Sequence, residues 1–88
     1  MVNNRRSEFD IIRQILKLTR EGAKKTEILY QSNMSYIQLQ NYLFYLIDKN
    51  ILEEQIVKEN GGMRKIYRNT DKGSNLLTDI NKTLSYFQ

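Results

Sequence analysis

The chain has 88 residues, a formal net charge of +4 and no Cys, His, Trp or Pro. That length predicts one small domain with a thin core, which dimerisation would help to complete. Without Cys there is no disulfide, thiolate nucleophile or thiolate metal ligand, and without His the commonest general base and zinc ligand are missing. The composition therefore predicts a protein that is not an enzyme and that uses no cofactor and no metal.

The positive charge is unevenly distributed along the chain. Residues 1–25 and 58–75 are basic, whereas residues 26–57 carry one basic and four acidic groups. This pattern fits ordinary solvated faces, or a surface for a polyanion if the fold brings the two basic segments together. No apolar run is long enough to span a membrane, and the polar segment 1–10 lacks a signal core, so we expect a cytoplasmic protein.

The first half of the chain has helical periodicity. Residues 1–6 are a polar, basic lead-in that we expect to be flexible, and Ser7 begins a helix that ends near Glu21, before a left-handed stop at Gly22. A short helix is predicted over residues 26–32, followed by a tight turn at Asn33 and Met34. Ser35 is a good N-cap for a third helix that runs to about Lys49.

After Asn50 the apolar period changes from helical to alternating. Residues 51–57 and 63–68 are predicted strands, and the turn signal Asn60-Gly61-Gly62 joins them into a hairpin. Thr70 then caps a last helix over residues 71–86, which would be about 24 Å long.

This order of elements predicts an α+β, mostly α, winged helix-turn-helix, in which two short helices and a tight turn precede a hairpin wing. We divide the chain into the lead-in, the winged helix-turn-helix over residues 7–69 and a C-terminal dimerisation helix over residues 70–88.

The same segments resemble the small archaeal winged-helix DNA-binding proteins. The resemblance covers residues 7–88 and rests on these stretches: Gly22-Ala23-Lys24-Lys25-Thr26-Glu27-Ile28-Leu29-Tyr30, Asn33-Met34-Ser35-Tyr36, Leu39-Gln40-Asn41-Tyr42-Leu43, Leu46-Ile47-Asp48-Lys49-Asn50-Ile51-Leu52 and Thr70-Asp71-Lys72-Gly73. It implies a homodimer, joined by an antiparallel coiled coil of the last helices, that binds DNA as a chromatin protein or transcription regulator. Two features depart from the family: Asn50 replaces the usual Gly, and the last helix is shorter than in the long-coiled-coil members.

The third helix is the candidate base-reading element. Residues 35–47 carry no charge, and the outward positions hold amides that can pair with adenine, hydroxyls that can bind phosphate, and Ile37, which could meet a thymine methyl. The candidate residues are Ser35, Tyr36, Gln38, Gln40, Asn41 and Tyr45. The alternative is a polar helix face, and exposed Ile37, Phe44 and Tyr45 would also suit a protein partner.

Two further groups are candidate phosphate contacts. Lys24, Lys25 and Thr26 lie at the N-terminus of the second helix, where backbone N–H groups favour an anion. Arg64 and Lys65 lie on the wing, and Lys58 lies on its other strand; the alternative for such residues is edge-strand charge that blocks aggregation.

The last helix carries Leu77, Ile80, Leu84 and Phe87 in a heptad-like spacing. These residues are either a dimer seam or a stripe packed on the first helix of the same chain. Taken together, the sequence predicts a homodimeric double-stranded DNA-binding protein associated with the nucleoid. A protein-interaction module, and a small-molecule sensor with a pocket at the dimer interface, are the alternatives.

Overall fold

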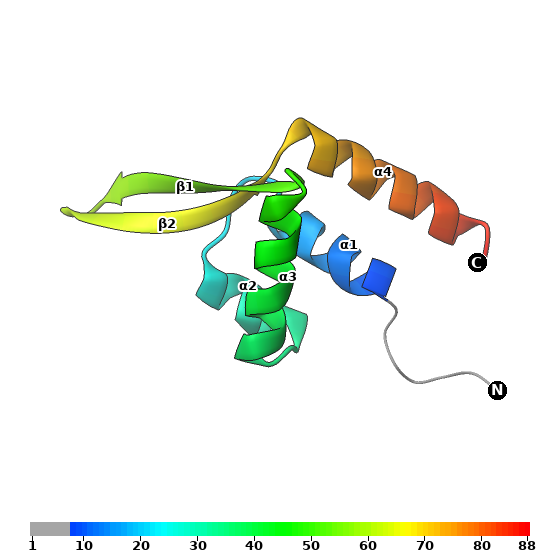
Figure 1. Ribbon diagram of the computed structural model, residues 1–88, viewed down its shortest axis with the longest axis horizontal. Coiled ribbons are helices and arrows are strands. Elements are labelled where there is room, and N and C mark those ends of the chain that lie inside the picture. Colours follow the sequence, from blue (N-terminus) through cyan, green and yellow to red (C-terminus); the bar gives the residue numbers. More distant parts are fainter. Residues whose placement is uncertain (1–7) are drawn as a thin grey trace.

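Three helices precede a hairpin and a fourth helix follows it in the computed structural model, which describes residues 8–88 (Figure 1). The elements are α1 (Glu8–Leu18), α2 (Lys25–Ser32), α3 (Tyr36–Asp48), β1 (Leu52–Glu59), β2 (Gly62–Asn69) and α4 (Asp71–Ser85). The hairpin extends away from the helices on one side, and α4 lies on the opposite side (Figure 1). This arrangement is a winged helix-turn-helix with an additional C-terminal helix, as the sequence predicts.

The expected helix starts and turns are confirmed where the structure describes them. Ser35 caps α3, and Thr70 caps α4 by accepting a hydrogen bond from the Gly73 N–H at 3.0 Å. Asn33 and Asn50 adopt φ values of 57° and 60°, the left-handed region that asparagine tolerates. The expected flexible lead-in and the expected cap at Ser7 lie outside the described residues.

The first helix is shorter than predicted, because α1 ends at Leu18 rather than near Glu21. Its last carbonyls are taken by a residue from the end of β2: Asn69 Nδ2 donates to Leu16 O at 3.0 Å, and Asn69 N donates to Thr19 O at 3.1 Å. The buried Thr19 hydroxyl lies 2.6 Å from Asn69 Oδ1. Asn69 therefore binds carbonyls at the end of α1 and just after it, a contact between segments fifty residues apart that local sequence signals cannot show.

The hairpin is longer at its tip than predicted. Its strands run to Glu59 and from Gly62, so only Asn60 and Gly61 form the turn, with φ values of 49° and 79°. Positive φ at both central residues is the signature of a type I′ turn. The resulting register pairs Lys58 with Met63, whereas Arg64 and Lys65 pair with Val57 and Ile56. Lys58 therefore lies on the strand opposite Arg64 and Lys65, as expected, and is offset from them by one and two positions.

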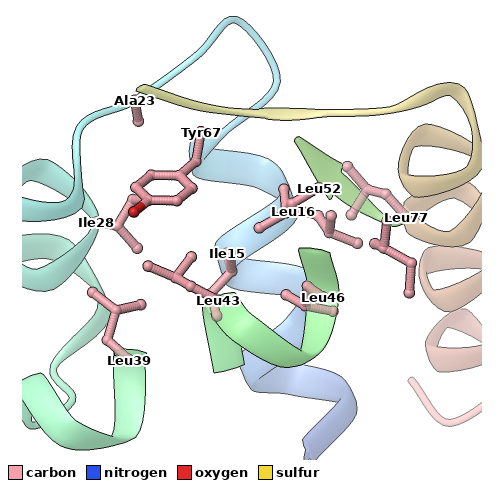
Figure 2. Close-up of a cluster of buried hydrophobic side chains, with 11 residues drawn as sticks. Ile15, Leu16, Ala23, Ile28, Leu39, Leu43, Leu46, Leu52, Tyr67 and Leu77 are labelled. Carbon is pink, nitrogen blue, oxygen red and sulfur yellow. The ribbon is translucent and has the colours of Figure 1, made fainter. Parts of the chain in front are cut away.

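Side chains from all four helices and both strands form one core (Figure 2). The predicted inward stripe of α3, Leu39, Leu43 and Leu46, is buried against Ile15 and Leu16 of α1. Ala23, expected in a plain connector, instead exchanges two backbone hydrogen bonds with Tyr67, at 2.9 and 2.8 Å. This bridge attaches the base of the wing to the segment between α1 and α2.

The last helix contributes to the same core. Leu77 and Ile80 are only 3% and 5% exposed, and Leu77 packs within the main cluster. The structure therefore assigns these two residues to the core of their own chain, the second of the two readings that their spacing allows. Leu84, in contrast, is half-buried, and Phe87 is 82% exposed.

Across the described residues, none of the helices combines the length and the apolar character that crossing a bilayer requires. Nor does residue range 8–88 contain a group of three or more acidic side chains that could hold a metal ion.

Candidate nucleic-acid interface

The first turn of α2 and the first turns of α3 meet at one surface. Lys25 begins α2, and its ammonium group lies 5.1 Å from the centre of the Tyr36 ring and 3.5 Å from the Tyr36 hydroxyl. The same ammonium donates a hydrogen bond to Gln40 Oε1. Three residues predicted separately, one as a phosphate contact and two as base-reading residues, are therefore brought into one cluster by the helix-turn-helix.

Local capping orients both helix ends of this surface. The Lys24 N–H donates to Glu27 Oε1 at 3.0 Å, which caps α2. At α3, Ser35 Oγ accepts from the Gln38 N–H at 3.1 Å and Gln38 Oε1 accepts from the Ser35 N–H at 3.2 Å. Ser35 and Gln38 thus form a capping box that stabilises the start of α3. Both side chains, which were predicted to contact bases, are engaged in this cap.

The remaining predicted residues of α3 are not all on this surface. Asn41 is exposed near Ile37, but Tyr45 lies beside Lys49, whose ammonium is 5.9 Å from the Tyr45 ring centre. Asn41 and Tyr45 also line a surface groove with Phe9 and Ile12 of α1. Asn41 and Tyr45 therefore both lie on the side of α3 that borders α1, and Tyr45 lies beside Lys49 rather than Lys25.

The two predicted wing cations point to opposite faces of the hairpin and are each paired with a carboxylate. Arg64 Nη1 lies 2.8 Å from Glu59 Oε2, and Lys65 Nζ lies 3.2 Å from Glu54 Oε2. Both pairs are substantially exposed, and such pairs contribute only about 0–1 kcal/mol. A phosphate could therefore take either cation from its carboxylate at little energetic cost.

The wing and the helix-turn-helix are linked through a buried tyrosine that the sequence reasoning did not single out. Tyr67 is 4% exposed at the base of β2, opposite Glu54 in the register. Burial raises the pKa of Tyr67 above its ordinary value of 10.0, and the Glu54 charge, a hydrogen bond to Glu54 and the nearby Tyr36 raise it further. An alternating strand pattern could have located this residue only if the register of the hairpin were already known.

Tyr67 should make the fold sensitive to alkaline pH. Because its pKa is raised in the folded state, the unfolded chain loses this proton first, and stability falls as pH rises above about 10. Tyr67 can lower the free energy of unfolding by at most about 1.4 kcal/mol per pH unit. Urea unfolding between pH 8 and 11 should show that Tyr67→Phe lacks this fall in stability. Tyr30→Phe, at a tyrosine that is 90% exposed, is the matched control and should keep the wild-type slope. Equal slopes for all three proteins would contradict the prediction.

The arrangement of helices, wing and interhelical turn defines a winged helix-turn-helix protein. Residues 5–86 match the winged helix-turn-helix family model, and the chain belongs to that family. No curated protein matches the chain at a significant level.

Solved structures show the same architecture. The chain is similar to Sso10a-2, a DNA-binding protein from Sulfolobus solfataricus, with 32% identity over 92% of this chain and 81% of that chain and a TM-score of 0.74. A PadR family transcription regulator from Clostridium difficile has a TM-score of 0.80 at 19% identity, covering 88% of each chain. Reduced YodB from B. subtilis has a TM-score of 0.75 at 22% identity, covering 92% and 78%. The last two likenesses concern the fold alone.

Proposed function

We propose that this protein binds double-stranded DNA, as a transcription regulator or chromatin-associated protein of the small archaeal type, without catalytic activity. The observation that carries the proposal is the cluster of Lys25, Tyr36 and Gln40, which joins a cation at one helix start to a hydrogen-bonding helix face. In a helix-turn-helix the second helix enters the major groove with its N-terminal residues toward the bases. The family membership and the 32% identity to a DNA-binding protein support the same function.

In the proposed complex, each element has a separate task. Lys24, Lys25 and Thr26 hold a phosphate at the start of α2, and α3 enters the groove through Tyr36, Gln40 and its other exposed residues. The wing places Arg64 and Lys65 against the backbone or minor groove. Residues 36–48 of α3 contain no Lys or Arg, and Lys49 follows directly after the helix. We therefore expect the affinity for DNA to come mainly from the phosphate contacts made by α2 and the wing.

Fluorescence anisotropy on a labelled duplex of random sequence, repeated across a salt series, tests this function. We expect binding that weakens steeply with salt, with a slope of about 0.9 for each phosphate contacted. Lys25→Ala should weaken binding to all sequences alike. Absence of binding even at low salt would overturn the proposal.

The protein-interaction alternative keeps one specific observation in its favour. Ile37, Phe44 and Tyr45 are 72%, 61% and 53% exposed, which is unusual for large apolar side chains on one helix. If the protein fails to bind DNA, this surface is where a partner protein would be sought.

We also propose that the protein is a homodimer, and that the contact lies beyond the buried part of α4. Phe9 of α1 and Leu84 of α4 border an almost wholly apolar groove, and Phe87 follows at the end of the helix. Truncation would remove Leu77 and Ile80 from the core, so point substitutions are the better test.

Leu84→Glu combined with Phe87→Glu should convert the dimer to a monomer that remains folded. Burying a carboxylate against an apolar partner is costly, whereas both positions tolerate charge in the isolated chain. Sedimentation velocity at micromolar concentration measures the mass, and circular dichroism checks the fold. Tyr30→Glu, at a 90% exposed position of α2, should leave the dimer intact. A wild-type monomer, or a double variant that remains dimeric, would contradict this interface.

A further inference from the structure

The exposed face of α3 near its start combines an apolar residue with a free amide. Ile37 is 72% exposed, and Asn41 is exposed one turn further along the same face. Among the described residues, no side chain or backbone group forms a hydrogen bond with the Asn41 amide. The neighbouring Gln40, in contrast, has its oxygen bound by Lys25, which leaves its NH₂ group as the free donor.

The same face lacks the side chains that read guanine. The commonest contact specific to guanine is a bidentate Arg or Lys, and residues 36–47 contain neither. Asparagine can instead bind adenine at N6 and N7, and an apolar side chain can contact the thymine methyl. Each type of side chain that α3 exposes here therefore matches one partner of an A·T pair.

From this face we infer that α3 selects A·T base pairs in the major groove, with Ile37 against a thymine methyl and Asn41 on an adenine edge. The inference rests on the proposed function and adds the class of DNA sequence that the protein prefers. Four helical residues advance about 6 Å, roughly the length of two base-pair steps. Ile37 and Asn41 consequently read two different pairs, about two steps apart, rather than the same pair.

The spatial setting of Ile37 fits a groove contact better than a structural role. The core positions of α3 are Leu39, Leu43 and Leu46, and Ile37 is not a member of the core or of the side chains packed against it. An exposed isoleucine gives no stability to the isolated chain, but it gains by burial against a methyl group in a complex. Lys25, at the start of α2, supplies the positive charge that holds the DNA backbone close to this face.

Three labelled duplexes of equal length test the inference by fluorescence anisotropy at fixed low salt. One contains only A·T pairs, the second has deoxyuridine in place of every thymidine, and the third contains only G·C pairs. We expect wild-type protein to prefer the A·T duplex over the G·C duplex. Loss of the thymine methyls should weaken binding about fourfold for each methyl that is buried.

Ile37→Ala should bind the thymidine and deoxyuridine duplexes equally. The matched control, Ile56→Ala, removes the same atoms from a residue on the wing that is 57% exposed. It should keep the wild-type ratio of the affinities for the thymidine and deoxyuridine duplexes. The variant Asn41→Ala tests the amide, with a duplex in which 7-deazaadenine replaces adenine and the N7 acceptor is therefore missing. This replacement should weaken binding by the wild-type protein but not binding by Asn41→Ala.

The outcomes separate this inference from the proposed function. Two results would overturn the A·T inference and leave the DNA-binding function standing. The first is salt-dependent binding with equal affinity for the thymidine and deoxyuridine duplexes. The second is an Ile37→Ala variant that still prefers the thymidine duplex as strongly as the wild type does. Failure to bind any of the three duplexes would overturn the function itself.

Discussion

Gly73→Ala should destabilise the protein by about 3 kcal/mol, although alanine is the better helix former. Gly73 is the third residue of α4, and a Cβ atom there would lie 2.2 Å from the backbone oxygen of Ile51. That oxygen cannot move freely, because it accepts from Thr70 N at 3.1 Å and from Thr70 Oγ1 at 3.1 Å. The clash therefore displaces the start of α4, and Leu77 with it, from the segment that joins α3 to β1.

Thermal unfolding followed by circular dichroism measures this effect. For a domain of this size, 3 kcal/mol corresponds to a fall in Tm of roughly 10–25 °C. The control is Ser74→Ala, at the next and exposed position of the same helix, which should change Tm by only a few degrees. A rise in Tm would contradict this prediction. It would mean that the higher helix propensity of alanine outweighs the clash, because α4 can shift away from Ile51.

The wing is expected to give the largest effect on DNA binding. Arg64→Ala combined with Lys65→Ala should weaken binding to every sequence by tenfold or more, and should flatten the salt slope by about two units. The substitutions remove two cations and also leave Glu59 and Glu54 without their partners, so two uncompensated carboxylates then add negative charge to the wing.

The reverse change should strengthen binding. Glu54→Gln combined with Glu59→Gln frees both cations, removes two negative charges from the wing and keeps the hydrogen-bond acceptor beside Tyr67. We expect affinity at low salt to rise by up to about tenfold, and the rise to shrink as salt screens the charges. The salt-series anisotropy assay measures both pairs of variants.

Lys17→Ala combined with Lys82→Ala provides the charge control for these experiments. It removes two exposed cations that lie outside α2, α3 and the hairpin, Lys17 on α1 and Lys82 on α4. Its salt slope should stay close to that of the wild type. An Arg64/Lys65 variant with the same slope as this control would exclude the wing from the DNA contact.

The sequence by itself was sufficient for the architecture because the relevant signals are local. Ser35 and Thr70 cap their helices through side chains that reach only three residues along the chain, and Asn60-Gly61 specifies its turn through backbone preferences. The stripe of Leu39, Leu43 and Leu46 identified the buried side of α3 and hence its exposed side. These features were enough to predict four helices, a hairpin and their order.

Only the tertiary structure decided the features that depend on contacts between distant segments. Asn69 of β2 binds the carbonyl of Leu16 at the end of α1, and the oxygen of Ile51 leaves no space for a side chain at position 73. The pairing of Arg64 and Lys65 with Glu59 and Glu54 followed from a strand register that the two-residue turn set. The spacing of Leu77 and Ile80 fitted a dimer seam and an internal stripe equally well, because a helical period specifies one face of a helix but not what covers it; the packing of α4 on the core decided between them.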